Sequence, residues 1–411
     1  MTAPAAFVTA GRHLNLRSVA GVAIAGFVFT IPIEELVAVP GIGSVSRLSG
    51  LIALAVGVVA LFGRGRVRLH VPPLLFVVMA AYVSWNLVSV YWSVQPSATI
   101  GRVVTLVQLL VSVWLVTEYC RGRARLLMML QAFVLGNCVA FGVTLANAVS
   151  SDFAGFRDVG RFDANEFAAV LALGIPMAAL LTAERRARFL HLVNLAYPAV
   201  AVFGVILAAS RGGLITALVA LLVIPLSLSR QRMSSKVAWS LATVLALGFG
   251  FVYAPRAFPE VYRNLERLGG TADELAEGTL TGRTEIWSET LEVFWESPLG
   301  GVGAGAARHA LKGGGFGVDK TVHNVFLAVA AETGVVGLLL FLGLMGIAVA
   351  AAFLAPQRQR TYVIVLALTL MVAMIPISIE ARKVTWFILA VLALHRPMVL
   401  SWARSNLGRY G

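Results

Sequence analysis

Residues 325–360 read VFLAVAAETGVVGLLLFLGLMGIAVAAAFLAPQRQR. Between Val325 and Leu354 the only ionisable side chain is that of Glu332, and the arginine-containing segment APQRQR follows at once. A helix of about 20 consecutive apolar residues is long enough to cross the hydrocarbon core of a bilayer. This stretch therefore predicts a transmembrane helix that ends at a basic loop.

The rest of the chain repeats this pattern. Its 411 residues are 59% hydrophobic and 13% charged, with a mean hydropathy of +0.85, whereas soluble domains carry about 25% charged residues. We expect an all-α polytopic membrane protein in which residues 1–411 form a single integral membrane domain, with an uncleaved signal-anchor as its first helix. Residues 1–100 are expected to contribute mainly lipid-facing helices. The apolar runs predict about 12 transmembrane helices, centred near residues 29, 54, 81, 109, 138, 174, 201, 220, 245, 341, 370 and 391.

Basic clusters indicate the orientation of these helices. RGRVR, RGRAR, ERRAR, SRQRMSSK and APQRQR fall at every second connection, and both termini carry arginines, which predicts that these loops and both termini are cytoplasmic. Segment 254–322, between the ninth and tenth helices, is then one long loop on the opposite side. The net charge of +13 is spread over short clusters, which argues against nucleic-acid binding, and the two cysteines do not suggest a disulfide or thiolate site.

Some basic residues lie in segments expected on the side opposite the cytoplasm, against the preference of basic residues for cytoplasmic loops. Some of them could be paired with Asp158, Asp163 or Glu380. Arg211, within ILAASRGGLITAL, lies near membrane depth, where an unpaired guanidinium costs several kcal/mol, so its partner could be an anionic ligand. The short segments on this side carry Arg47, Arg102, Arg157, Arg161, Arg211, Arg382 and Lys383.

Two histidines, His309 and His323, are expected on the same side as the long loop. His323 and Asn324 stand where this loop enters an apolar helix, in DKTVHNVFL. A histidine there can be a general base, because its ordinary pKa is about 6.5, or it can be part of a helix cap together with Asn324.

The long loop itself has internal order. GRTEIWSETLEVFWESPLG predicts an amphipathic helix at the membrane interface, with Trp287, Leu291, Phe294 and Trp295 on its apolar face. The glycine-rich segment GGVGAGAARHALKGGGFG follows, and it could be a plain linker or a flexible lid. It lacks the strand and the GK[ST] ending of a phosphate-binding P-loop.

The stretches DANEFAA, SRGG, GRTEIW, PLGGVGAG, HNVFL and ETGVVGLL, in this order and topology, resemble the O-antigen ligase and polymerase superfamily. The resemblance covers most of the chain. It implies a fold like that of the C-type glycosyltransferases (GT-C) and an active site facing the periplasm of the bacterial inner membrane. The donor would be O-antigen linked to undecaprenyl diphosphate. In ligases the acceptor is a sugar hydroxyl of the lipid A-core, and the product is lipopolysaccharide.

The resemblance also implies roles for individual residues. Arg211 of SRGG and Arg283 of TGRTE would bind the donor diphosphate, and His323 would be the catalytic histidine. Topology adds Arg157 and Arg161 to the donor site. The supporting residues would be Asn324 and Glu332.

Diphosphate is a good leaving group, so the reaction needs charge stabilisation and a base for the acceptor hydroxyl, without a nucleotide or other cofactor. No DxD motif occurs in the sequence, and we expect no metal requirement. Inversion at the anomeric carbon is an expectation from the family.

Two alternatives remain open at this stage. An O-antigen polymerase, which extends one lipid-linked glycan with another, would share the fold and the donor, and relatives that glycosylate proteins would look similar. From a different class, about 12 helices with cytoplasmic termini also suit a secondary transporter, for which Glu332 is the main candidate proton-coupling residue. The long loop that carries both Arg283 and His323 favours a ligase.

Overall fold

The computed structural model describes residues 16–62, 73–150, 163–184, 187–227, 237, 283–311 and 321–394. These residues are almost entirely helical, apart from a short hairpin in which strand β1 (Ala38–Val39) pairs antiparallel with β2 (Gly43–Ser44). The all-α prediction is therefore confirmed for this part of the chain.

The first half of the chain forms consecutive helices. They are α1 (Leu16–Thr30), α2 (Val45–Phe62), α3 (Pro73–Val88) with the 3-10 turn η1 (Ser89–Tyr91), α4 (Pro96–Tyr119), α5 (Arg123–Ser150), α6 (Ala164–Ala183) and α7 (Arg188–Leu207).

Shorter helices are mixed with long ones in the second half. They are α8 (Arg211–Leu221), α9 (Val223–Ser227), α14 (Arg283–Glu296), α15 (Ala307–Ala310), α16 (Val325–Phe353), α17 (Arg360–Ala373) and a last helix, Lys383–Leu394.

Seven of the described helices are long and apolar enough to cross a membrane, and four shorter apolar helices accompany them. Eleven of the predicted helix centres fall inside described helices, and the centre near residue 245 lies outside the described residues. The protein is thus an all-α membrane protein, while the full count of about 12 spans stays a prediction.

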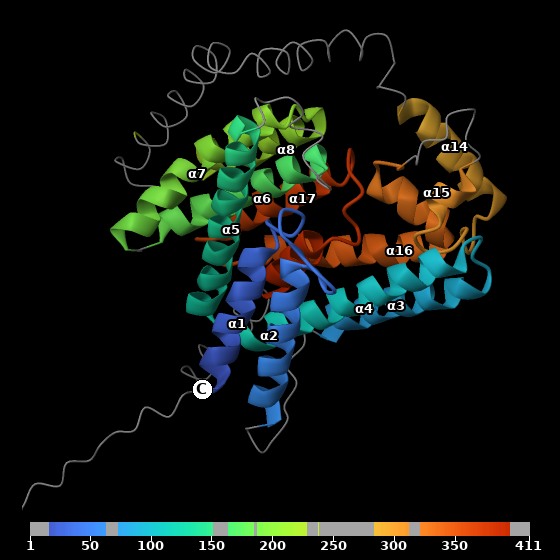
Figure 1. Cartoon of the computed structure of the whole chain (residues 1–411), viewed down its shortest axis with the longest axis horizontal. Helices are drawn as coiled ribbons and strands as arrows, with labels where there is room; N and C mark the ends of the chain where they lie inside the picture. Colours follow the sequence, from blue (N-terminus) through green and yellow to red (C-terminus); the bar gives the residue numbers. More distant parts are fainter. Residues whose placement is uncertain are drawn as a thin grey trace, which may run out of the picture.

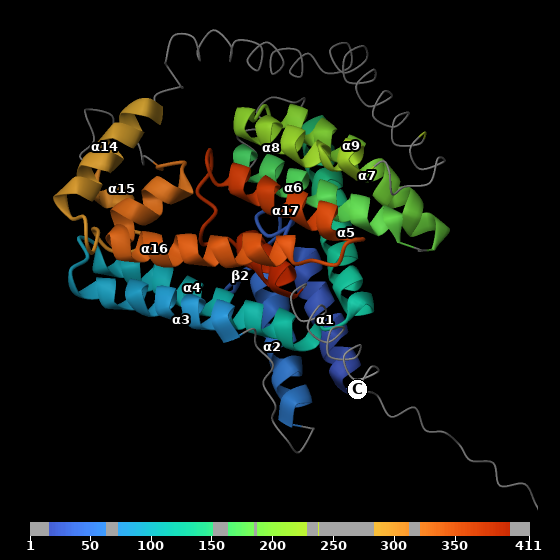
Figure 2. The same cartoon turned by 180° about the vertical axis from the view of Figure 1, so that it is seen from behind.

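Helix α6 forms the centre of one half of the structure. It is apolar on all sides, and 89% of its most apolar stretch is buried in the protein, where α5, α7, α8 and α17 pack around it. The Tyr197 hydroxyl of α7 donates to the carbonyl of Leu171, and it lies where a side chain on Gly174 would be. On the other side of the molecule α16 runs beside α3, next to α4, and α14 and α15 cover its first turns (Figures 1 and 2).

Helix α16 is broken at Gly334, which has φ 64° and ψ −169°. The glycine-rich loop after α14 packs against this break. The backbone N–H groups of Val302 and Gly303 donate to the carbonyls of Ala331 and Glu332, each at 2.9 Å. The break therefore leaves these two carbonyls satisfied by the loop and not by the helix.

Candidate functional site

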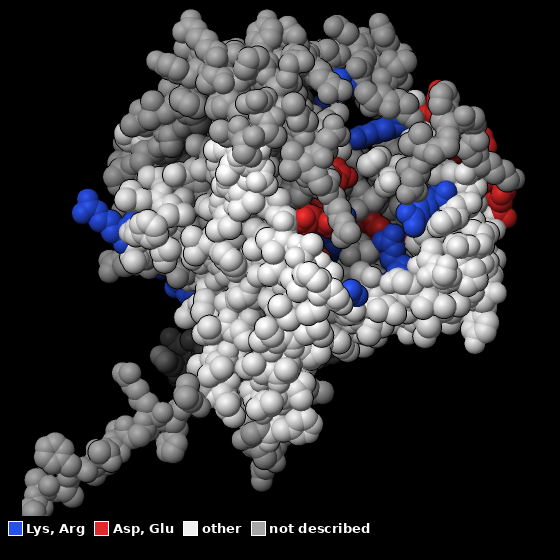
Figure 3. Space-filling model, viewed as in Figure 1, with Lys and Arg blue, Asp and Glu red and all other residues white. Residues whose placement is uncertain are grey.

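A hollow lined by charged side chains, which we call the central cavity, lies between the start of α4, the loop around α15, the start of α16 and the segment after α17. Its volume is about 490 Å³. Figure 3 shows Lys, Arg, Asp and Glu side chains gathered around this hollow, in contrast to the largely uncharged helix surfaces beside it. The charged residues that line it are Arg102, Arg308, Glu332, Glu380 and Arg382.

Arg102 of α4 holds two of these carboxylates. Its Nη1 lies 2.6 Å from Glu380 Oε1, and its Nη2 lies 3.9 Å from Glu332 Oε1. Both carboxylate side chains are at least nine-tenths buried. The prediction that some basic residues on this side pair with acids such as Glu380 is confirmed for Arg102.

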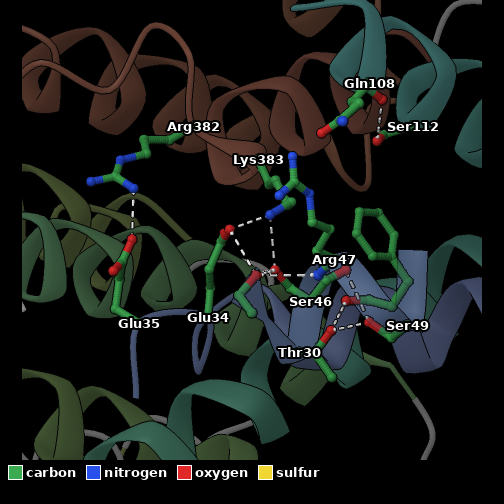
Figure 4. A network of polar contacts seen from close by, with 12 residues as sticks. Thr30, Glu34, Glu35, Ser46, Arg47, Ser49, Gln108, Ser112, Arg382 and Lys383 are labelled. Atoms are coloured by element: carbon green, nitrogen blue, oxygen red, sulfur yellow. Dashed lines mark hydrogen bonds and ion pairs between the residues drawn. The ribbon is translucent and has the colours of Figure 1, made fainter. Parts of the chain in front are cut away.

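Arg382 and Lys383, at the start of the last helix, pair with acids in the segment after α1 and in the first turn of α6. Arg382 contacts Glu35 at 2.7 Å and Glu166 at 2.8 Å, and Lys383 forms an ion pair with Glu34 (Figure 4). The segment after α1 thus contributes to the charged centre. Glu34 and Glu35 are exceptions to the expectation that residues 1–100 contribute mainly lipid-facing helices, which stays a prediction.

His323 stands directly before α16 but does not cap it. The side chain of Asn324 accepts the N–H groups of Phe326 and Leu327, at 3.0 and 3.1 Å, and so satisfies the helix start alone. His323 adopts φ 49°, which is uncommon for a residue with a side chain. Its buried Nδ1 has no hydrogen-bond partner among the described residues.

Two charges act on the imidazole of His323. Burial lowers the pKa of His323 below its ordinary value, the positive charge of Arg283 lowers it further, and the negative charge of Asp163 partly opposes the change. Charged residues of two other predicted motifs, Arg283 of TGRTE and Asp163 of DANEFAA, are thus close enough to His323 of HNVFL to influence its pKa. The shifted pKa favours a neutral imidazole at neutral pH.

Arg283 is the first residue of α14, and α14 is tied to the histidine segment. The indole N–H of Trp287 donates to the carbonyl of Val322 at 3.0 Å. The predicted amphipathic helix exists, but its apolar face divides: Trp287 packs inward with Val293, whereas Leu291 and Trp295 are 44% and 67% exposed. The sequence pattern alone could not separate a face that packs on protein from one available to lipid.

Arg211 is the first residue of α8, and the SRGG turn explains its position. Ser210 caps α8 by accepting the N–H of Gly213, and its hydroxyl donates to the side chain of Asn165 at 2.8 Å. A side chain on Gly212 would meet Pro376 at 2.6 Å, so only glycine allows this approach. Arg211 is half-buried and is not without a partner in the structure, so an anionic ligand for it stays a proposal.

The segment 374–376 links SRGG to HNVFL. The N–H of Val325 donates to the carbonyl of Met374 at 2.9 Å, two residues before the proline that packs on Gly212. Because Asn165 joins the same turn from α6, the N-termini of α6, α8 and α16 belong to one connected region. Helix N-termini carry partial positive charge, so this region favours an anion. The predicted donor residues Arg157 and Arg161 lie outside the described residues.

Glu332, one of the predicted supporting residues, contacts the glycine-rich loop and α4 as well as its own helix. Besides the ion pair with Arg102, it accepts hydrogen bonds from the backbone of Gly305 and Ala307. It thereby fixes the glycine-rich loop against α4 and α16. Residues 300–311 of this loop are packed, which fits neither a plain linker nor a lid, and residues 312–320 lie outside the described residues.

The side chains of the described ranges contain no group of three or more His, Cys, Asp or Glu that could hold a metal ion. The two acids of the central cavity, Glu332 and Glu380, are instead paired with Arg102. Sequence reasoning noted Arg102, Arg382 and Lys383 only as basic residues against the orientation bias. That same signal could have marked them as site residues.

The described helices thus form a membrane protein with a charged cavity whose wall includes Thr321 and Val322, directly before His323. Residues 196–342 match the family model described as O-antigen ligase, and this region contains Arg211, Arg283 and His323. The resemblance inferred from the motifs is thus confirmed for this part of the chain, which is similar to the O-antigen ligase family. This family covers O-antigen ligases and related polymerases, glycosyltransferase-like enzymes of lipopolysaccharide pathways. No curated protein matches the chain.

Proposed function

We propose that this protein is an O-antigen ligase, which transfers O-antigen glycan from undecaprenyl diphosphate to a sugar hydroxyl of the lipid A-core on the periplasmic face of the inner membrane. The observation that supports it best is the state of His323. Asn324 alone caps α16, so the neighbouring histidine has no capping role. His323 is nevertheless held in an uncommon backbone conformation. Strained residues of this kind cluster at functional sites.

The donor diphosphate is the group that the arginines would bind. Arg211 and Arg283 come from the starts of α8 and α14, and guanidinium groups suit phosphate oxygens because they can bind two at once. The connected N-termini of α6, α8 and α16 add partial positive charge. Arg157 and Arg161, just before α6, are proposed as further donor contacts.

His323 would act as the general base. In the proposed reaction the acceptor hydroxyl attacks the anomeric carbon, its proton passes to the neutral imidazole, and the bond from that carbon to the diphosphate oxygen breaks. The negative charge that develops on the leaving diphosphate is stabilised by the arginines. In-line displacement inverts the anomeric centre.

The ion pairs of the central cavity also bear on the transporter alternative. Glu332 is paired with Arg102 and accepts two backbone hydrogen bonds. These contacts give Glu332 a part in fixing the glycine-rich loop, so no proton-coupling role is needed to account for it. We therefore assign Glu332 and Asn324 supporting roles that hold the loop and the start of α16.

The test combines purified protein with undecaprenyl diphosphate-linked glycan and lipid A-core, with products resolved by gel and mass spectrometry. We expect glycan on the lipid A-core without nucleotide or metal, and activity that survives chelation. A His323→Ala variant should lose transfer, whereas the matched His309→Ala variant should keep it. The opposite result for the two histidines would refute the assignment of the base.

The related polymerase is the second candidate, because the matched family covers both activities. The same assay distinguishes the two. Growth of the lipid-linked glycan with unmodified lipid A-core would establish a polymerase and replace the ligase proposal. Activity restored only by added metal after chelation would overturn metal independence.

A further inference from the structure

A second cavity lies beside the central one, on the other side of Arg382. Its volume is about 320 Å³, within the range of about 300–1,000 Å³ typical of ligand sites. It is bordered by the β1–β2 hairpin, the start of α2, the middle of α4 and the segment before the last helix. The two cavities share Thr105, Ala381 and Arg382 in their walls.

The charge lining this second cavity is not balanced. Glu34 and Glu35 are matched by Lys383 and Arg382. Arg47 is exposed and makes no ion pair within the described ranges; its Nη1 donates to the carbonyl of Ile42 at 3.2 Å. Figure 4 shows Arg47 extending toward Lys383 in the space that both residues line. Arg47 is therefore the one charged residue of the cavity wall that makes no ion pair within the described ranges.

The α4 wall of the cavity is uncharged but polar. Thr105, Gln108 and Ser112 lie on one face of this apolar helix, over roughly 10 Å of its length. Polar side chains on a membrane-spanning helix normally face protein, water or a ligand and not lipid. Hydroxyl and amide groups of this kind are suited to hydrogen bonding with the hydroxyls of a sugar.

Exposed apolar side chains occur on α2 and α4 close in sequence to the residues that line the cavity. Leu51 and Ile52 of α2 are 55% and 53% exposed, and Val104 and Val107 of α4 are 47% and 44% exposed. A ligand with acyl chains could lie along these residues while its head group occupies the polar cavity. A free sugar phosphate would leave them uncovered.

We infer that the cavity lined by Arg47, Gln108 and Ser112 binds the phosphorylated sugar head group of the glycolipid acceptor. This inference rests on the proposed function and divides the site into two. The donor diphosphate is bound by Arg211 and Arg283 near His323, and the acceptor head group occupies the second cavity. Arg47 contacts the acceptor phosphate, and the α4 side chains contact its sugar hydroxyls.

The test measures binding without turnover, using full-length protein in nanodiscs and lipid A-core with or without its phosphates. Arg47→Ala should weaken binding of phosphorylated lipid A-core by about tenfold, the usual effect of losing a charge-assisted hydrogen bond. Wild-type protein should bind dephosphorylated lipid A-core about as weakly. Arg47→Lys should recover part of the loss, and donor affinity should not change.

Two further variants serve as controls. Arg358→Ala removes an exposed arginine in the turn between α16 and α17 that does not line the cavity, and it should leave acceptor binding unchanged. Gln108→Leu keeps the charge of the cavity, so it should weaken the binding of both forms of lipid A-core alike.

The outcomes separate this inference from the proposed function. Wild-type affinity of Arg47→Ala for phosphorylated lipid A-core would overturn the inference, even if the protein transfers glycan to that acceptor. An equal loss of affinity for phosphatidylglycerol would assign the cavity to ordinary lipid and would also overturn it. Absence of transfer to lipid A-core by the wild type would instead refute the proposed function.

Discussion

Arg102 is the residue on which two buried carboxylates depend, and Arg102→Met tests the charged centre of the structure. The substitution keeps most of the volume but leaves Glu380 and Glu332 facing each other without their shared cation. The side chains of these acids are 6% and 10% exposed, so neither is well solvated. Removing one partner of a buried ion pair costs about 3–5 kcal/mol.

The expected loss lies near the lower end of that range, about 3 kcal/mol, because the Arg102 side chain itself is 25% exposed. The melting temperature in detergent should fall on the order of 5 °C. Adding Glu380→Gln removes the stranded charge, so the double variant should regain at least part of the loss. The reasoning is refuted if Arg102→Met melts like the wild type, or if Glu380→Gln makes the double variant still less stable. Arg358→Met is the control for loss of an exposed arginine.

Other parts of the site give further predictions. Because the pKa of His323 lies below its ordinary value, transfer activity should fall only as the pH drops below about 6.5. Arg283→Ala removes a nearby positive charge, so it should move this loss of activity to higher pH, which a pH profile of kcat can measure. Gly301→Ala should lower the melting temperature, since the φ of Gly301 is +67° and a Cβ would overlap the backbone of Glu332. The control Gly346→Ala in α16 should leave the melting temperature unchanged, because a Cβ there meets nothing within 4 Å. Asn324→Ala should cost about 1 kcal/mol of stability and Asn324→Ser much less, which thermal unfolding can compare.

The membrane helices could be predicted because apolar runs and basic turns are local signals. Helix centres from residue 29 to residue 391 fall in helices wherever the chain is described. The break in α16 could not be predicted in the same way. Gly334 lies in an apolar run that reads as one helix, and its backbone conformation depends on a loop that approaches from residues 298–303.

The candidate site was predictable only in its conspicuous residues. His323 and Arg283 could be singled out because they lie in recognisable stretches, and their electrostatic proximity agrees with that choice. The ion pairs of Arg382 and Lys383 could not be found, since Glu35 and Glu34 lie 347 and 349 positions away. No local pattern encodes a contact between the end of the first helix and the start of the last.

The break in α16 has a mechanical consequence for an enzyme that works at a membrane surface. The turns from Val325 to Thr333 are bonded to the loop and, through the indole of Trp85, to α3, so contacts outside α16 also hold them in place. When the bilayer becomes thicker or thinner, the long part can tilt about Gly334 while the histidine keeps its position. We therefore expect turnover to vary little across bilayers of different acyl-chain length, because a change in bilayer thickness would alter the tilt of the long part of α16 and leave the first turns of the helix in place.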